Sequence, residues 1–150
     1  MPTVRDILKH KGAGVATIAP ARTVIEAAQS MNDRRIGSLV VLRDGEVIGM
    51  FTERDILVRV VAARKDPETT TVGEVMTTPI VSCTPDTPLS ECKSMVTNLR
   101  IRHIPVIEEG KLLGIVTSGD VVAREAFERE GTIESLCEYI GGPGVRAAQL

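Results

Sequence analysis

An internal repeat constrains this chain more than any other feature. The phrase GMFTERD at residues 49–55 recurs as GIVTSGD at residues 114–120, and a shift of 65 positions superimposes the Gly, the Thr and the Asp of the two phrases. Under the same shift, ten of the 45 positions from 15 to 59 are identical to their counterparts. A fixed period is the signature of a duplicated structural unit. The chain must therefore fold as two copies of one unit.

Each copy predicts the same succession of elements. VATIA (15–19) and IVSCT (80–84) indicate short strands. Residues 23–34 and their counterparts then carry apolar residues at helical spacing. Two further strands flank Asp44-Gly45 in the first copy and Glu109-Gly110 in the second, which is typical of hairpins. A helix is expected to follow each motif Thr. The fold class is thus α/β of the α+β type, with two tandem β-α-β-β-α repeats.

One copy of about 60 residues would leave one face of its sheet bare, so we expect the two copies to pack sheet to sheet with pseudo-two-fold symmetry. The polar segment RKDPETTT (64–71) is the expected linker. It separates a first repeat (1–63) from a second (72–130). An amphipathic C-terminal helix with an N-cap at Thr132, and a flexible tail, are predicted within 131–150.

Composition excludes several classes of function. A net charge of −2 and 2% aromatic residues argue against nucleic-acid binding. The stretch MPTVRDILKHKG at residues 1–12 has no apolar core of signal-peptide length, and no apolar run approaches about 18 residues. We therefore expect a cytoplasmic protein without a membrane segment. Two histidines and three cysteines without a Cys-x-x-Cys spacing predict no metal site. The chain offers no nucleophile–base pair and no P-loop, so we expect no enzyme.

The Thr and the Asp of each motif have two readings. In the first, they form a capping box that only starts a helix. In the second, the same helix N-terminus binds phosphate, and the carboxylate accepts the hydroxyls of a ribose. The motif Gly either allows close approach of a ligand or marks a bulge. The capping box does not explain the Gly, nor why the whole phrase recurs after the same hairpin.

With these motifs, the sequence resembles a tandem pair of CBS domains, also called a Bateman module. The resemblance rests on GMFTERD, GIVTSGD and the stretch IRHIPVIEEGKLLGIVTSGD, and it covers nearly the whole chain. It implies a regulatory binding module rather than a catalyst. Ligands of this family are adenosine compounds: AMP, ADP or ATP, and in some members S-adenosylmethionine or a dinucleotide. No cofactor is required.

The resemblance also implies site residues. Asp55 and Asp120 would hold ribose, with Thr52 and Thr117 beside them. The residues implied for the base pockets are Thr17, Ser82, Ile104, Pro105 and Val106. Some members bind phosphate through a basic pair before the hairpin strand; this pair corresponds to Arg102 and His103 in the second copy but to Gly37 and Ser38 in the first. The two sites are therefore expected to be unequal.

Modules of this kind commonly pair, so we expect a homodimer that acts on an unknown regulated protein. The ligand would change the angle between the halves or the docking of the C-terminal helix. An alternative is a ligand-independent structural or dimerisation module that keeps the fold without using its clefts. The intact Thr and Asp of both motifs argue against that alternative.

Overall fold

The computed structural model describes residues 1–12 and 14–141, with side chains through residue 129. In chain order the elements are α1 (Val4–Lys11), β1 (Thr17–Ile18), α2 (Val24–Arg34), β2 (Ser38–Arg43), β3 (Glu46–Thr52), α3 (Glu53–Asp55), the π-helical η1 (Ile56–Val61), α4 (Val72–Val75), α5 (Leu89–Asn98), β4 (His103–Glu108), β5 (Lys111–Thr117) and α6 (Ser118–Gly141). The predicted order of strands and helices is confirmed apart from the first strand of the second copy.

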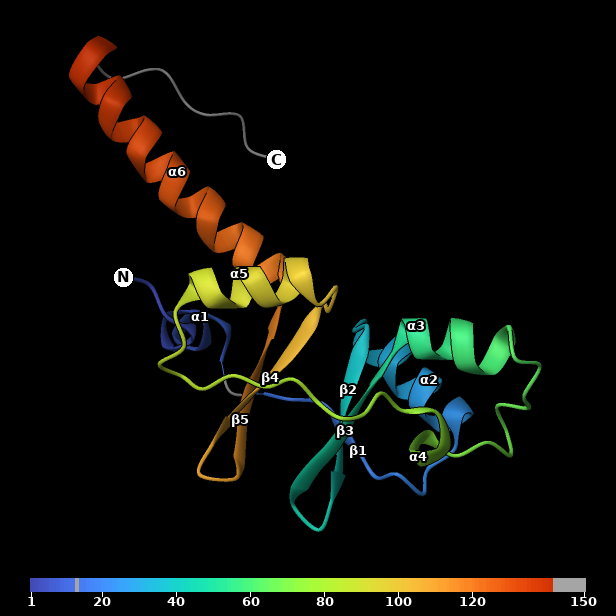
Figure 1. The fold of residues 1–150 in the computed structure, drawn as a ribbon. Helices are drawn as coiled ribbons and strands as arrows, with labels where there is room; N and C mark the ends of the chain where they lie inside the picture. Colours follow the sequence, from blue (N-terminus) through green and yellow to red (C-terminus); the bar gives the residue numbers. More distant parts are fainter. Residues whose placement is uncertain (13, 142–150) are drawn as a thin grey trace.

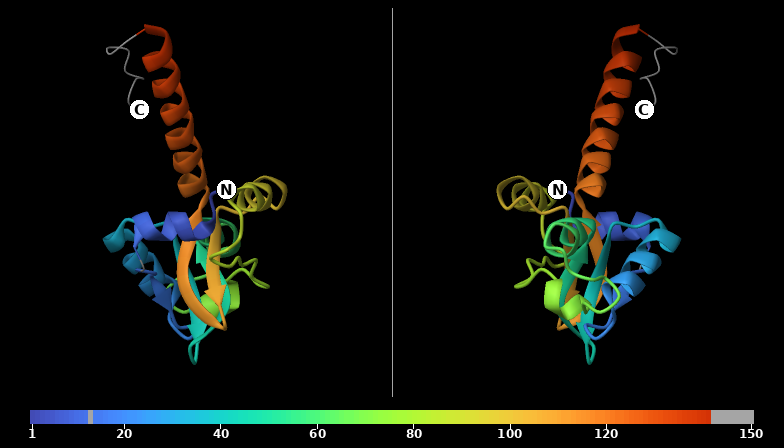
Figure 2. Two further views of the ribbon diagram at one scale, coloured as in Figure 1. Left: turned by 90° about the vertical axis from the view of Figure 1, so that its left-hand side faces the viewer. Right: turned by 90° about the vertical axis from the view of Figure 1, so that its right-hand side faces the viewer.

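The strands form two small sheets, β1-β2-β3 and β4-β5. Both predicted hairpins are present. Their turn residues Asp44, Gly45, Glu109 and Gly110 all have positive φ values, as the tight turns that match strand twist require. We call the body around β1, β2 and β3 the first half, and the body around β4 and β5 the second half. The two sheets lie at the centre of the molecule with the helices outside them (Figures 1 and 2).

Alternation along the strands explains this layering. Leu39, Val41 and Phe51 are completely buried and belong to the core between the first sheet and its helices. Val40 and Met50 are also buried, but they lie on the opposite face of the sheet, outside that core. A sheet buried on both faces needs a second layer, and the other sheet supplies it. The predicted α+β fold with two packed repeats is confirmed.

The short helices that lead into each repeat are exchanged between the halves. Val4 and Ile7 of α1 are buried in the core of the second half, with residues of α5, β4 and β5. Val72 and Val75 of α4 are buried in the core of the first half. Figure 1 shows α1 beside α5, and α4 beside α2. The repeats predicted at 1–63 and 72–130 therefore follow the sequence period, whereas each spatial half is completed by a helix from the other repeat.

The strand predicted at residues 80–84 is wrong. Only Cys83 remains paired, in a parallel bridge with Val106. In the first half, the Val40 amide donates to the Ala16 carbonyl at 3.0 Å. The counterpart of Val40 is Pro105, which has no amide hydrogen and cannot make this bond. One proline thus shortens the second sheet to two strands.

The C-terminal helix does not begin at Thr132, so that prediction is also wrong. α6 runs without a break from Ser118 to Gly141, and it projects away from the body in both views of Figure 2. Gly131 costs an interior helix position only about 1 kcal/mol, and no proline interrupts the segment. The apolar side chains predicted to line the helix after Thr132, and the tail at 142–150, lie outside the described part of the chain.

Candidate functional site

Both motifs form the predicted capping box. In the first half, Thr52 N donates to Asp55 Oδ2 at 2.9 Å and Asp55 N donates to Thr52 Oγ1 at 3.4 Å. In the second half, the corresponding bonds between Thr117 and Asp120 are 2.8 and 3.1 Å. One carboxylate oxygen in each half is thus used to start the helix. The site is available to a ligand only if the second carboxylate oxygen has no bonding partner within the protein.

The motif glycines allow the segments of the exchanged helices to pack closely against the hairpins. Each lies opposite a register shift in its hairpin, between Val41 and Leu42 in the first half and at the same place in the second. A Cβ built on Gly114 would lie 2.5 Å from Leu8 Cδ2 of α1, and one on Gly49 would lie 2.7 Å from the sulfur of Met76. The bulge and the close packing of a helix therefore account for the Gly without a ligand.

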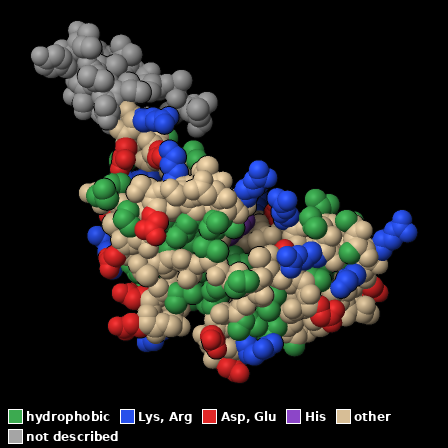
Figure 3. Space-filling view, viewed as in Figure 1, with side chains coloured by type: hydrophobic (Ala, Val, Ile, Leu, Met, Phe, Trp, Pro, Cys, Tyr) green, Lys and Arg blue, Asp and Glu red, His purple; other side chains and the backbone are tan. Residues whose placement is uncertain are grey.

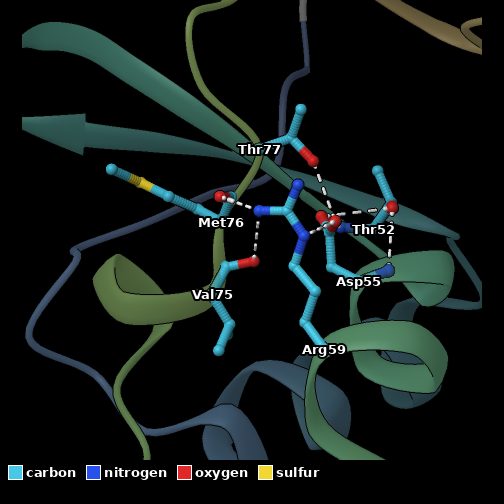
Figure 4. Close-up of polar contacts among 6 residues, drawn as sticks. All are labelled: Thr52, Asp55, Arg59, Val75, Met76 and Thr77. Atoms are coloured by element: carbon cyan, nitrogen blue, oxygen red, sulfur yellow. Dashed lines mark hydrogen bonds and ion pairs between the residues drawn. The ribbon is translucent and has the colours of Figure 1, made fainter. Parts of the chain in front are cut away.

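In the first half, the second oxygen of Asp55 is occupied (Figure 4). Thr77 Oγ1 donates to Asp55 Oδ1 at 2.8 Å, and Arg59 Nε lies 3.7 Å from the same oxygen. Arg59 also donates to the carbonyls of Val75 at 3.4 Å and Met76 at 2.8 Å. Asp55 is only 5% exposed. Its carboxylate is a structural link between the first motif and the segment that follows α4.

In the second half, Asp120 is more accessible. Its side chain is 24% exposed, and Lys11 Nζ donates to Asp120 Oδ2 at 2.8 Å. Within the described chain, no group is bonded to Asp120 Oδ1. Burial alone would raise the pKa of Asp120, but the hydrogen bonds from Lys11 and from the Thr117 amide lower it below its ordinary value. An ionised carboxylate with one free oxygen can accept a ligand hydroxyl.

His103 lies among the charged groups of this half. Burial lowers the pKa of His103, and the positive charges of Lys11 and Arg102 lower it further, whereas Glu53 and Asp120 oppose the shift. His103 is half-buried on β4, directly opposite Thr117 on β5. Lys and Arg side chains gather where the two halves meet, beside a His side chain, on the face shown in Figure 3.

The position before the hairpin strand is Gly37 in the first half and Arg102 in the second, and the charges at this position are opposite in the two halves. In each half a carbonyl there accepts from the residue after the motif Thr: Gly37 O from Glu53 N at 3.1 Å, and Arg102 O from Ser118 N at 2.9 Å. The Glu53 carboxylate lies over Gly37, 3.1 Å from where a Cβ would be. A carboxylate thus covers Gly37 in the first half, whereas the counterpart of Gly37 in the second half is the basic residue Arg102.

The residues predicted for the base pockets are only partly brought to the surface between the halves. Thr17 and Ser82 are exposed. Pro105 is buried, and strand alternation places it on the face of β4 opposite the helices. Ile104 and Val106 are completely buried in the core of the second half. Their side chains face the core in this structure, which leaves their backbone to meet a ligand, and their part in a base pocket stays a prediction.

Three residues of the site were missed from the sequence: Lys11, Arg59 and Thr77. Lys11 and Thr77 belong to the exchanged segments, and no sequence pattern indicated that these segments are exchanged between the halves. Arg59 follows the first motif on the same helix face, at i+4 from Asp55, which is a spacing that could have been noticed. Its counterpart Arg124 points instead toward Glu128 and the ring of Phe127.

Other chemistry is limited in the described part of the chain. It contains no group of three or more His, Cys, Asp or Glu side chains arranged for a metal ion. No described helix is long and apolar enough to span a membrane. Cys83 and Cys92 are buried free thiols, and the hydrogen bond with Cys92 together with burial raises the pKa of Cys83. A neutral thiol of this kind is a poor nucleophile.

Comparison with known proteins gives a consistent result. The family described as "CBS domain" matches residues 4–62 and 72–126. The mitochondrial protein CBSX3 of Arabidopsis thaliana is 34% identical over 93% of this chain and 72% of its own length. A crystal structure of a CBS-domain protein from Agrobacterium tumefaciens is 36% identical, with a TM-score of 0.79 over 83% of this chain and 99% of that one. The CBS domain pair of protein MJ0100, crystallised with 5-methylthioadenosine and S-adenosyl-L-methionine, is 25% identical, with a TM-score of 0.76 over 85% of this chain and 98% of that one.

Proposed function

This chain belongs to the CBS domain family, and on that premise we propose that it is a regulatory module that binds an adenosine-containing ligand at the Asp120 motif of its second half. The observation that carries the proposal is the difference between the two carboxylates. Asp55 has both oxygens engaged and is 5% exposed, whereas Asp120 keeps one oxygen free of any bond from the described residues. The complex of MJ0100 with two adenosine compounds supports the ligand class. AMP, ADP and ATP are the first candidates, with S-adenosylmethionine or a dinucleotide as further ones.

Binding becomes regulation if the ligand favours one arrangement of the halves over another. The site is suited to this, because its parts come from distant segments. Lys11 belongs to α1, His103 to β4 and Asp120 to α6, while Glu53 of the first half is close enough to influence the pKa of His103. A bound ligand would therefore bear on the contact between the halves and on the start of the projecting α6. A partner protein could detect either change.

We also propose that the module acts as a homodimer. Leu57, Val58 and Val61 on η1 are 63, 51 and 63% exposed, and Val122 and Phe127 on α6 are 63 and 66% exposed. Leu57 and Val122 are counterparts under the shift of 65 positions, so the two halves expose apolar side chains at equivalent places. Large exposed apolar patches mark interaction surfaces. Sedimentation should show a dimer for the wild type and a monomer for Leu57→Glu with Val122→Glu.

The function is tested by thermal unfolding with AMP, ADP, ATP, S-adenosylmethionine and NAD, with GTP as a control. A ligand at about 100 times its dissociation constant adds about 2.7 kcal/mol of stability. We expect at least one adenosine compound to raise the melting temperature of the wild type. The increase should vanish in Asp120→Asn and persist in Asp55→Asn, measured against each variant's own baseline.

No shift with any of these compounds at millimolar concentration would favour the alternative, a ligand-independent structural or dimerisation module. The closed first motif is the observation that supports this alternative, since it shows that the same residues can serve packing alone. Consumption of a ligand during the incubation would contradict a purely regulatory role. Loss of the shift in Asp55→Asn but not in Asp120→Asn would show that the ligand binds at the first motif and not at the second.

A further inference from the structure

We infer that Lys11 is a ligand-binding residue of the second-half site, and that it makes this site select a phosphorylated adenosine over an uncharged or cationic one. The inference rests on the proposed function. It adds the class of ligand, a phosphorylated adenosine, and the residue that recognises it, Lys11. Lys11 ends α1, more than a hundred positions before Asp120 in the sequence. No motif in the second repeat contains it.

The position of the ammonium group is well defined by its surroundings. Lys11 Nζ donates to the Ile115 carbonyl at 3.1 Å and to Asp120 Oδ2 at 2.8 Å. An ammonium has three donors, so one remains for a ligand, and the Lys11 side chain is 33% exposed. The helix that carries Lys11 is anchored by Val4 and Ile7 in the core and by Leu8 against Gly114. The charge is therefore held beside the carboxylate before any ligand arrives.

Lys11 and Asp120 together present a donor and an acceptor side by side. Asp120 Oδ1 can accept a ribose hydroxyl, while the remaining N–H of Lys11 needs an oxygen acceptor. A phosphate oxygen is the strongest such partner, because a charge-assisted hydrogen bond is about twice as strong as a neutral one. The exposed Arg102 adds a second positive charge, placed next to the start of α6 by the bond from Ser118 N to Arg102 O.

The first half shows what the site would be without this arrangement. A shift of 68 positions, which carries Val4 of α1 onto Val72 of α4, carries Lys11 onto Pro79. Gly37 stands where the second half has Arg102, and the Glu53 carboxylate covers it. The first half thus has neither basic group at the equivalent place and carries a negative charge there. The basic group beside Asp55 is Arg59, which is bonded to the carbonyls of Val75 and Met76.

The experiment compares adenosine with AMP, which differ by one phosphate, using isothermal titration calorimetry. The wild type should bind AMP at least about tenfold more tightly than adenosine, and S-adenosylmethionine no more tightly than adenosine. Lys11→Met should reduce the preference for AMP by about tenfold, whereas Lys11→Arg should preserve most of it. Lys9→Met is the matched control, because it removes the same charge from an exposed position on the same helix.

A readout on the wild type alone keeps the test independent of how well the variants fold. Raising the salt concentration from about 50 to about 500 mM should weaken AMP binding much more than adenosine binding, because salt screens partly exposed charges. Equal affinity for adenosine and AMP, or a preference unchanged in Lys11→Met, would overturn the role of Lys11 and leave the proposed function intact. Absence of binding by both compounds would overturn the selection of AMP, and the proposed function falls with it if thermal unfolding also shows no shift with ADP, ATP, S-adenosylmethionine or NAD.

Discussion

The two motifs have the same Thr, the same Asp and the same capping geometry, yet their carboxylates have different partners. Thr77 and Arg59 hold the second oxygen of Asp55, whereas the corresponding oxygen of Asp120 has no bond within the described residues. Thr77 follows α4 and Lys11 ends α1, so both of these partners lie in or next to the exchanged helices. The motif therefore decides where a carboxylate lies, and the exchanged segment decides whether that carboxylate is free.

The largest difference between the halves is expected from removing the motif charges. Asp55→Asn should lower the free energy of unfolding by about 3 kcal/mol, because Arg59 and Thr77 lose a buried charged partner. Asp120→Asn should cost about 1 kcal/mol, because the Lys11 ion pair is partly exposed. Urea denaturation at pH 7 measures both, with the exposed hairpin variant Asp44→Asn as the control. Equal costs would show that the two carboxylates have the same structural role.

The exchange of α1 and α4 gives the next largest effect. Val4→Ala and Val72→Ala should each cost about 2 kcal/mol, because each removes completely buried apolar volume. Amide hydrogen exchange should show lost protection in β4 and β5 for Val4→Ala, and in β2 and β3 for Val72→Ala. The exchange is refuted if each variant instead loosens the sheet of its own sequence repeat.

The motif glycines offer a finer comparison. An alanine Cβ at position 49 would meet not only the Met76 sulfur but also the backbone carbonyl of Thr77 at 3.1 Å, whereas at position 114 it would meet only the end of the Leu8 side chain closely. Overpacking against a backbone is harder to relieve than against a flexible side chain. Gly49→Ala should therefore cost about 2 kcal/mol and Gly114→Ala about 1 kcal/mol in thermal unfolding. The reverse order would mean that α1 packs more rigidly than α4.

The smallest effect concerns His103, whose counterpart Ser38 cannot titrate. The pKa of His103 is lowered in the folded state, while an unfolded His titrates near 6.5. The unfolded chain therefore binds the proton more readily, so the stability contributed by neutral His103 is complete above about pH 6.5 and is lost as the pH falls through the folded pKa. His103→Gln should flatten the fall in stability between pH 7 and pH 5. A fall in stability as steep in His103→Gln as in the wild type would contradict this role of His103.

Most of the architecture could be predicted from the sequence, because short local patterns determine it. The repeat, the Asp-Gly and Glu-Gly hairpins and the Thr–Asp capping boxes all depend on residues close together in the chain. The predictions that failed depend on contacts across the chain or on a single residue. Pro105 removed a strand pairing through its missing amide hydrogen, and α6 continued past Thr132 because nothing in 118–141 is costly enough to stop it.

The candidate site was predicted less completely for the same reason. Thr117, Asp120 and His103 lie within one repeat, and the structure brings them together. Lys11 reaches them only because α1 packs on the second half, which no periodicity indicates. The family resemblance implied Ile104 and Val106 for the base pocket, and strand alternation turns the side chains of both toward the core.

The exchanged helices also have a consequence for how the protein is made. During synthesis α1 leaves the ribosome long before its packing partners, which extend to Val121. The core of the first half, in turn, is complete only after Val75 has emerged. Contacts between such distant segments form late and slow folding. The apolar face of α1 is therefore fully covered only after Val121 has been translated, and until then a chaperone could bind it.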